Sequence, residues 1–293
     1  MLKLTAEEKK ALKGRGIILC RDQETFVARI VTVDGTLTSL QMQKLAEAAE
    51  KFGSGRAALT IRLSVELQGI TYDNIEPMCE FLAPYGLFTG GTGAKIRPVV
   101  PCKGSVCPHG LIDTQGLARE LHERYYLGWR SETLPHKFKI GVGGCPNNCI
   151  KPSLNDFGIM GQRVPAYDPE KCRACKKCNV EAACPMKICH PGEDGKMARQ
   201  ADACTHCGKC IDACSFGAVS EEVRGYRIML GGVWGKRQRI ATPLPGVYTK
   251  EDVFHILDRA LHIWQEQGRA GERFGLFVER IGFENFEKQL LAE

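Results

Sequence analysis

The chain has 293 residues, is 43% hydrophobic and carries a formal net charge of +6. This length and apolar content are sufficient for a buried core of two or three units. No stretch reaches the roughly 18 uninterrupted apolar residues of a membrane span, and residues 1–16 are charged, without the apolar core of an export signal. These observations predict a soluble, cytoplasmic protein that does not bind a membrane.

The basic charge balance favours an anionic partner. The sequence has no long Lys/Arg run, no helix-turn-helix signature and no aromatic RNA-binding motif, so nucleic acid is not the expected partner. A small anion or an acidic cofactor is preferred.

The first ninety residues predict a small α+β unit. An extended β-branched segment over 26–33 precedes a helix over Ser39–Phe52, whose apolar residues recur at helical spacing. A strand over 57–64 and a helix near 74–85 follow. The alternation of strand and helix indicates one layered unit.

A second, α/β unit is expected after the glycine-rich turn at residues 90–93. It contains a strand ending at Cys102, a helix over 113–126 and a strand over 137–142. Regular patterning stops between about 161 and 224. It resumes over 226–230, before helices over Lys250–Gln267 and 272–291, and the Thr249-to-Asp252 spacing predicts a capped helix start. The expected units are therefore 1–90, then 91–162 together with 224–293, and an insert at 163–223.

Fifteen cysteines are too many for small apolar fillers in a reduced cytoplasm, so metal ligation is the better explanation. Cys20, Cys79 and Cys189 are expected to be ordinary thiols. The other twelve fall into three groups of four.

Two of these groups lie in the insert. Cys172, Cys175 and Cys178 form C-x2-C-x2-C, with Cys184-Pro185 after them, and the pattern returns at Cys204, Cys207, Cys210 and Cys214. The segment resembles a bacterial two-cluster [4Fe–4S] ferredoxin, in which the remote fourth cysteine of each motif ligates the other cluster. By that rule Cys172, Cys175, Cys178 and Cys214 bind one cluster, and Cys204, Cys207, Cys210 and Cys184 bind the second.

Two departures from this ferredoxin pattern are visible. The gap before Cys184 is five residues, and Ser215 stands where proline is usual. A pair of zinc ribbons is disfavoured, because zinc takes ligands in two pairs and would leave the third cysteine of each triplet without a purpose.

The third group is Cys102 and Cys107 with Cys145 and Cys149. Both pairs lie on loops, and a loop–helix–loop return can bring them together. From spacing alone a [4Fe–4S] cluster and a zinc site are equally open.

The sequence around this third group resembles the siroheme sulfite and nitrite reductases. The shared features are C-x4-C followed by G-C-P-N-N-C, an arginine shortly before, Lys-Phe-Lys between, Gly161, and the final G-E-R-F-G-L-F-V-E-R-I-G-F-E-N-F segment. The gap between Cys102 and Cys107 is one residue shorter than the commoner family spacing. Within the family, the chain is closest to the small anaerobic sulfite reductase subunit that carries its own ferredoxin domain.

This resemblance implies an α+β fold: a ferredoxin-like N-terminal unit plus an α/β siroheme domain, with the ferredoxin domain inserted. It also implies that Cys149 bridges a [4Fe–4S] cluster to the siroheme iron. The cofactors would then be siroheme and three [4Fe–4S] clusters.

Four cations match the family's anion-binding residues: Arg62, Arg97, Lys137 and Lys139. Strand alternation places Lys137 and Lys139 on one face. Arg62 and Arg97 lie in apolar, strand-like stretches, where an unpaired cation would be costly. These four are the expected catalytic residues, with Lys151 as a weaker addition.

The run from Gly90 to Lys95 is not a phosphate loop, because it lacks the G-K-[ST] ending. Close approach of backbone to a flat macrocycle is the preferred reason for its glycines, and a simple tight turn is the alternative. Gly91, Thr92, Gly93 and Asn148 are therefore candidate cofactor contacts, together with Arg62, Arg97 and Cys149. His109 and His136 receive no role.

The implied activity is six-electron reduction of sulfite to sulfide, with electrons passing from the ferredoxin clusters to the third cluster and the siroheme. Nitrite reduction to ammonia and a non-catalytic iron–sulfur electron carrier remain open as alternatives. The expected donor is a ferredoxin or a reductase subunit. Because larger family members contain two related halves, a homo-oligomer or a hetero-complex is expected.

Overall fold

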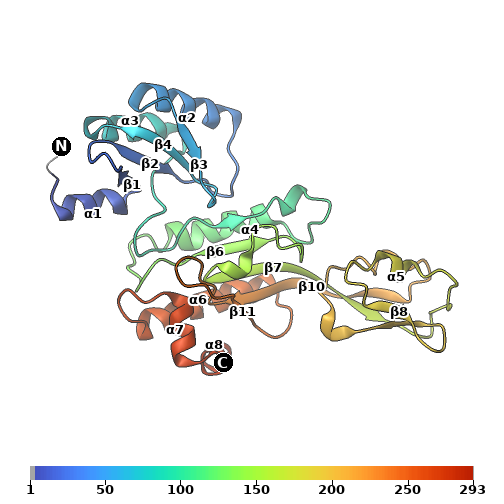
Figure 1. Ribbon diagram of the computed structural model, residues 1–293. Coiled ribbons are helices and arrows are strands. Elements are labelled where there is room, and N and C mark those ends of the chain that lie inside the picture. Colours follow the sequence, from blue (N-terminus) through green and yellow to red (C-terminus); the bar gives the residue numbers. More distant parts are fainter. Residues whose placement is uncertain (1–3, 293) are drawn as a thin grey trace.

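The computed structural model describes residues 4–292, arranged as an N-terminal unit, a central sheet with its helices, and an insert at one side (Figure 1). The N-terminal unit lies at the top of Figure 1, and the insert projects away from the central sheet. Within residues 4–292, no helix has the length and apolar character needed to cross a membrane.

The N-terminal unit is a four-stranded antiparallel sheet in the order β1-β2-β4-β3, packed on two helices. Strand β2 alternates buried Phe26, Ala28 and Ile30 with less buried residues, so one face enters the core. Helix α2 starts at a capping box between Thr38 and Gln41. The elements are α1 (Ala6–Gly14), β1 (Ile17–Leu19), β2 (Phe26–Ile30), α2 (Ser39–Phe52), β3 (Ala57–Leu59), β4 (Val65–Ile70) and α3 (Ile75–Leu82).

The segment after α2 differs from the prediction. The strand expected over 57–64 ends at Leu59, and the chain reverses in a tight turn before β4, which was not expected. Leu63, with φ of 60°, and a hydrogen bond from its N–H to the Thr60 carbonyl close this turn. Arg62 therefore lies on a hairpin turn and not inside a strand.

The central sheet has five strands in the order β11-β10-β7-β6-β5. Strands β5, β6 and β7 are parallel, and β10 and β11 are antiparallel to their neighbours. Aromatic side chains of Phe138, Trp264 and Phe274 form the centre of its core. Its elements are β5 (Val100–Pro101), α4 (Thr114–Leu121), β6 (Ile140–Gly143), β7 (Phe157–Tyr167), β10 (Val219–Leu230), β11 (Thr242–Pro243), α6 (Lys250–Gln267), α7 (Phe274–Ile281) and α8 (Phe283–Leu291).

Helix α6 has the predicted bounds, and Thr249 and Asp252 form the predicted capping box. The helix expected over 272–291 is two helices, because Gly282 adopts φ of 83° between α7 and α8. The helix expected over 113–126 is α4 continued by a π-helical turn, His122–Leu127. These differences leave the expected layering unchanged.

Strands β7 and β10 form a long antiparallel pair that leaves the central sheet and carries the chain into the insert (Figure 1). The insert contains α5 (Asn179–Ala183), β8 (Cys189–Pro191) and β9 (Met197–Arg199). Its apolar core is small and consists of Val180, Ile188, Cys189, Met197 and Val219. Because the strand pair runs through the expected boundaries at 162 and 224, insert and sheet share two continuous strands.

Candidate redox and anion-binding site

Parallel strands bring the third group of cysteines together. Cys102 follows β5 and Cys145 follows β6, and these strands pair in parallel at Val100–Gly141 and Pro101–Val142. Their carboxyl ends therefore meet at one edge of the sheet. Burial raises the pKa of the Cys145 thiol, and the thiols of Cys102, Cys149 and Cys107 raise it further. The four thiols are thus neighbours, as the spacing predicts.

Gly144 lies against the third group of cysteines, where it has no side chain to obstruct the thiols and its backbone N–H donates a hydrogen bond to one of them. Its N–H donates to Sγ of Cys102 at 3.1 Å. A Cβ at this position would lie 2.9 Å from Cα of Gly104 and 3.3 Å from that sulfur. A Cβ at Gly161 would lie 2.5 Å from the Gly144 carbonyl oxygen. Both glycines are required for the backbone to approach the thiols this closely.

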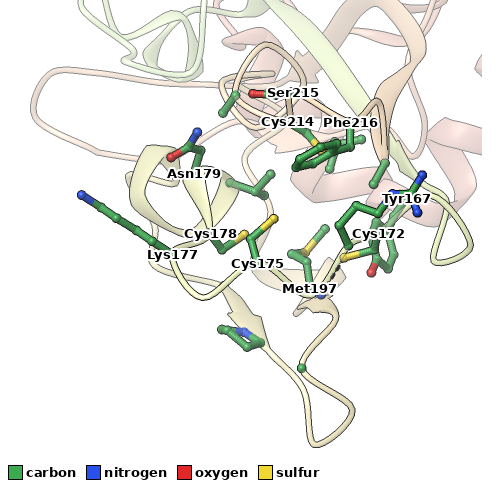
Figure 2. Close-up of a pocket in the computed structure, with 17 residues that line it drawn as sticks. Tyr167, Cys172, Cys175, Lys177, Cys178, Asn179, Met197, Cys214, Ser215 and Phe216 are labelled. Atoms are coloured by element: carbon green, nitrogen blue, oxygen red, sulfur yellow. Dashed lines mark hydrogen bonds between the residues drawn. The ribbon is translucent and has the colours of Figure 1, made fainter.

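The insert gathers its cysteines in the two expected sets. Cys172, Cys175, Cys178 and Cys214 line one cavity, with Tyr167 and Phe216 on its wall (Figure 2). Cys184, Cys204, Cys207 and Cys210 line a second cavity. The remote cysteine of each motif therefore lies with the triplet of the other motif, as the ferredoxin pattern requires. We call these groups the outer set and the inner set, respectively.

Within residues 4–292, no three His, Cys, Asp or Glu side chains are close enough to hold a single metal ion. A [4Fe–4S] cluster binds each thiolate through a different iron, so its ligands stand further apart than those of one ion. The donor set of four thiols without imidazole or carboxylate also fits an iron–sulfur cluster.

The four expected cations come together from three segments. The Arg62 guanidinium reaches from the N-terminal unit and donates to the Pro98 carbonyl at 2.7 Å and to Oδ1 of Asn155 at 3.2 Å. Burial, with Arg97 next, lowers the pKa of Arg62 to about 10. Burial and then Arg29 lower the pKa of Arg97 to about 10. Neighbouring cations therefore lower the pKa of both Arg62 and Arg97, which places these side chains close to other positive charges.

The strand expected over 137–142 begins at Ile140, so Lys137 and Lys139 lie in the segment before it and not in a strand. Both lie near Arg273 and Arg62, on either side of the fully buried Phe138. Burial, followed by Arg273, lowers the pKa of Lys137. The same two causes lower the pKa of Lys139 to about 8. Among the described residues, the cluster therefore holds more positive charge than its one buried carboxylate can neutralise. An anionic ligand bound there would stabilise the charged forms of these side chains.

One buried carboxylate lies inside this cationic cluster. Asp156 is fully buried, and it accepts the backbone N–H of Lys139 at 2.9 Å and two bonds from Arg273 at 3.0 and 3.1 Å. Burial raises the pKa of Asp156, and Arg273 opposes that rise. Asp156 fixes Arg273 and the Lys139 backbone in place.

The glycine loop holds one of these cations. Arg97 donates to the carbonyls of Gly91 and Gly93, the latter at 3.0 Å. The Gly91 N–H donates to the Tyr126 hydroxyl at 3.0 Å, and the Thr92 hydroxyl donates to the Lys13 carbonyl. The loop therefore positions Arg97, and its role as a cofactor contact stays a prediction.

Several buried polar atoms in this region have no partner among the described residues. They are Nε of Arg62, Arg97 and Arg273, and Oδ1 of Asn148. Three unsatisfied guanidinium N–H groups fit a ligand rich in carboxylates or an oxyanion. Lys151 is exposed, on the loop after Cys149.

Sequence reasoning missed Arg273, Asp156, Asn155 and Arg29, and it assigned no role to His136, which lies near the same cations. Arg29 donates to Glu66 and to the Gly91 carbonyl, and the surrounding cations lower the pKa of His136 in addition to burial. Arg273 lies in the quoted G-E-R-F motif, which was a usable signal. No sequence signal pointed to Asp156, because a single Asp after a loop is common in proteins.

The loop over 144–156 joins the thiols and the cations. It leaves the carboxyl end of β6 at Cys145 and returns to the amino end of β7, next to Asp156. Cys149 lies within it. Because β6 and β7 are parallel, Cys145 lies at the carboxyl end of β6 and Asp156 at its amino end, and the loop crosses from one group to the other.

The sequence matches the family described as the nitrite and sulphite reductase 4Fe-4S domain over residues 92–293. It also matches the nitrite/sulfite reductase ferredoxin-like half domain over residues 20–85. The two matches correspond to the central and N-terminal units of the fold. The predicted family and the predicted α+β sulfite/nitrite reductase fold are confirmed, and the assignment of the insert as a two-cluster ferredoxin domain stays a prediction.

Similar proteins include an uncharacterised protein of Methanocaldococcus jannaschii, 30% identical, with 94% of both chains covered. The coenzyme F420-dependent sulfite reductase of the same organism is 28% identical, over 85% of this chain and 39% of that protein. One subunit of the anaerobic sulfite reductase of Salmonella typhimurium is 25% identical, over 88% of this chain and 80% of that subunit.

A crystal structure of dissimilatory sulfite reductase I has the same fold, with a TM-score of 0.72 and 21% identity over 92% of this chain and 69% of that one. The Mycobacterium tuberculosis NirA protein follows with a TM-score of 0.68, 14% identity, and coverage of 98% of this chain and 46% of that one. With its family matches, its paired thiol loops and its cationic cluster, the chain belongs to the nitrite and sulphite reductase family of oxidoreductases.

Proposed function

We propose that the chain catalyses the siroheme-dependent six-electron reduction of sulfite to sulfide, with electrons supplied through two ferredoxin-type [4Fe–4S] clusters and a third, siroheme-coupled cluster. The observation that carries this proposal is that one unit, β6 with the loop over 144–156 and β7, carries a four-thiol group at one end and a cluster of five cations around Asp156 at the other. The same chain therefore supplies both the cations that would hold an oxyanion and the thiols that would hold a redox centre.

The residues present fit these cofactors. Cys102, Cys107, Cys145 and Cys149 would hold the third cluster, and Cys149 would also face the siroheme iron. When bound, siroheme would supply the iron that takes the substrate's central atom and delivers electrons to it. The unpartnered Nε groups of Arg62, Arg97 and Arg273 would donate to its carboxylates or to the substrate.

The arginines and the lysines of the cluster would have different roles. Arginines stay charged throughout and would hold the oxyanion's oxygens. Lys139, with its pKa lowered to about 8, loses a proton far more readily than an ordinary lysine, and the pKa of Lys137 is lowered too. Reducing one hydrogensulfite to hydrosulfide and three waters takes six electrons and six protons. The two lysines would pass those protons to departing oxygen.

Sulfite is favoured over nitrite by the extent of the similarities. The matches named sulfite reductase subunits, from Allochromatium vinosum and Salmonella typhimurium, cover 85% and 88% of this chain. The two named nitrite reductases cover 51% and 47%. Because the cations would hold either oxyanion, turnover of both substrates side by side is the deciding measurement.

The test is anaerobic purification followed by iron and tetrapyrrole analysis and turnover with an artificial one-electron donor. We expect siroheme absorption, about thirteen irons (twelve from three clusters of four and one from siroheme), and sulfide as product. Lys137→Met and Lys139→Met should lower turnover and leave the absorption spectrum intact. Full iron content without tetrapyrrole, together with refusal of added siroheme, would make the chain an electron carrier and end the reductase proposal.

A further inference from the structure

The inner set of insert cysteines lies against the third thiol group. Cys207 of the inner set and Cys145 of the third group line the same pocket, together with Pro146, Asn147 and Arg163. No other chain is needed to bring these two groups together. The inner set is therefore in position to pass electrons to the third group directly.

Arg163 of β7 fixes this junction. Its backbone N–H donates to the His206 carbonyl at 2.8 Å, and its guanidinium pairs with Asp212 at 2.5 Å and with Glu221. A Cβ at Gly208 would lie 2.5 Å from the Arg163 side chain, so this loop packs directly on it. The face of the insert that carries Cys207 is occupied by the chain itself.

The outer set has a free face. Cys175 is exposed, and the neighbouring Phe216, on the wall of the same cavity, is 54% exposed. Figure 2 shows the Cys175 and Cys178 sulfurs close together at the cavity, with the Lys177 side chain extending away from them. Electrons from outside can reach this set without crossing the rest of the fold.

The free face is basic. Arg173, Lys176 and Lys177 flank Cys175 and are exposed. Among residues 4–292, no carboxylate lies within ion-pair distance of these three, whereas Lys171 pairs with Asp168 at 3.1 Å. An apolar side chain next to three exposed cations without an ion-pair partner among the described residues is the complement of an acidic protein surface with an apolar centre. We call Arg173, Lys176, Lys177 and Phe216 the basic face.

We propose that the basic face docks an acidic one-electron carrier protein, whose electrons enter at the outer set, cross to the inner set and leave through Cys207 toward Cys145. This inference rests on the proposed function, because it requires clusters at all three sets. In each encounter the carrier loses one electron and the outer cluster gains it. No bond forms, and six encounters supply one sulfite.

The test compares two reductants with the holoenzyme. The probe carrier is an acidic bacterial ferredoxin, and the small-molecule reductant is photoreduced deazaflavin. The variant is Lys176→Glu with Lys177→Glu. The matched control is Lys9→Glu with Lys10→Glu, an equally charged, exposed pair on α1 in the N-terminal unit. Iron content is measured for each protein.

With ferredoxin in stopped flow, we expect cluster reduction about tenfold slower in the Lys176/Lys177 variant at low salt, and unchanged in the control. The wild-type rate should fall as salt rises. Deazaflavin should reduce all three proteins equally. If ferredoxin reduced the clusters of the two variants at equal rates, or if the wild-type rate did not depend on salt, the proposal that the basic face docks the carrier would be wrong. Absence of reducible clusters with deazaflavin would instead overturn the proposed function.

Discussion

Nη2 of Arg273 donates to both carboxylate oxygens of Asp156, at 3.0 and 3.1 Å, and this carboxylate is completely buried. Burial, then Arg273 and Arg62, lowers the pKa of Lys139, and Asp156 opposes them, so the carboxylate lies among these three cations. A buried anion inside a cationic cluster does two things. It neutralises part of the charge in the absence of substrate, and it fixes the direction of Arg273, which would otherwise be free to move away.

Asp156→Asn should therefore destabilise the cofactor-free protein. The substitution keeps one acceptor oxygen but removes the charge, so the buried guanidinium loses its ion-pair partner. Breaking one side of a buried pair costs about 3–5 kcal/mol. Urea unfolding measures the change in free energy. Asp212→Asn, which removes a partner of Arg163 that is 69% exposed, should cost less than about 1 kcal/mol. Equal losses in the two variants would contradict the structural role of Asp156.

The lowered pKa of Lys139 predicts that oxyanion binding to the cofactor-free protein depends on pH. Lys139 is charged below about 8 and neutral above it. A bound anion favours the charged form and raises this pKa, so binding takes up a proton. Affinity should then fall by up to about tenfold per pH unit as the pH rises above 8. Sulfate is a suitable probe, because its own charge is constant over this range.

Calorimetry from pH 7 to 10 measures this dependence, and buffers of different ionisation enthalpy report the proton uptake. Lys139→Arg keeps its charge over the whole range. Its sulfate affinity should therefore change much less with pH. A wild-type profile that matches the arginine variant would show that Lys139 does not face the anion.

The cysteine sets were predictable because their signal is local. Two-residue spacing acts within a few residues, and the structure gathers the cysteines that this spacing connected. Strand alternation at Lys137 and Lys139 was a wrong premise, because β6 begins only at Ile140. The capped start of α6 at Thr249 is another local signal, and it is confirmed. Ligation of clusters by these cysteines remains a prediction.

The missed features depend on contacts between distant segments. Arg273 and Asp156 are 117 positions apart, and no local pattern links them. Strand β7 was missed because six consecutive residues from Phe157 are buried on both faces, so the alternation that marks a half-buried strand is absent. The turn at Arg62 was missed because Leu63 adopts a positive φ without being glycine.

Single cysteine substitutions should separate ligands from ordinary thiols. Cys175→Ser removes a ligand of the outer set, so the iron content should fall by about four per chain. Cys189→Ala changes a buried thiol beside the inner set and should retain all the iron. Quantitative iron analysis with electron paramagnetic resonance measures both. Iron loss in the Cys189 variant and none in the Cys175 variant would refute the assignment of sets.

Gly144→Ala should damage the third group alone. The new methyl group would lie 2.9 Å from Cα of Gly104, which is too close for a carbon pair, so the Cys102 loop must shift. The N–H that donates to Cys102 Sγ shifts with it. We expect loss of about four irons, with the outer and inner sets retained. Gly217→Ala, at a glycine whose Cβ would meet nothing within 4 Å although its φ is 67°, tests whether any loop glycine has this effect.

Arg163→Ala should loosen the insert at its junction without unfolding the protein. Its guanidinium is 16% exposed, but Asp212 and Glu221 are more exposed, so the ion pairs contribute about 1 kcal/mol or less to global stability. That free energy corresponds to about fivefold faster amide exchange in the loop over 204–212, which packs on Arg163. Hydrogen-exchange mass spectrometry measures it. Arg224→Ala, which also removes a partner of Glu221, leaves the 204–212 contacts intact and should leave exchange there unchanged. Equal acceleration of amide exchange in both variants would contradict this prediction. It would mean that pairing with Glu221, and not the contact with Arg163, holds the loop over 204–212 against the sheet.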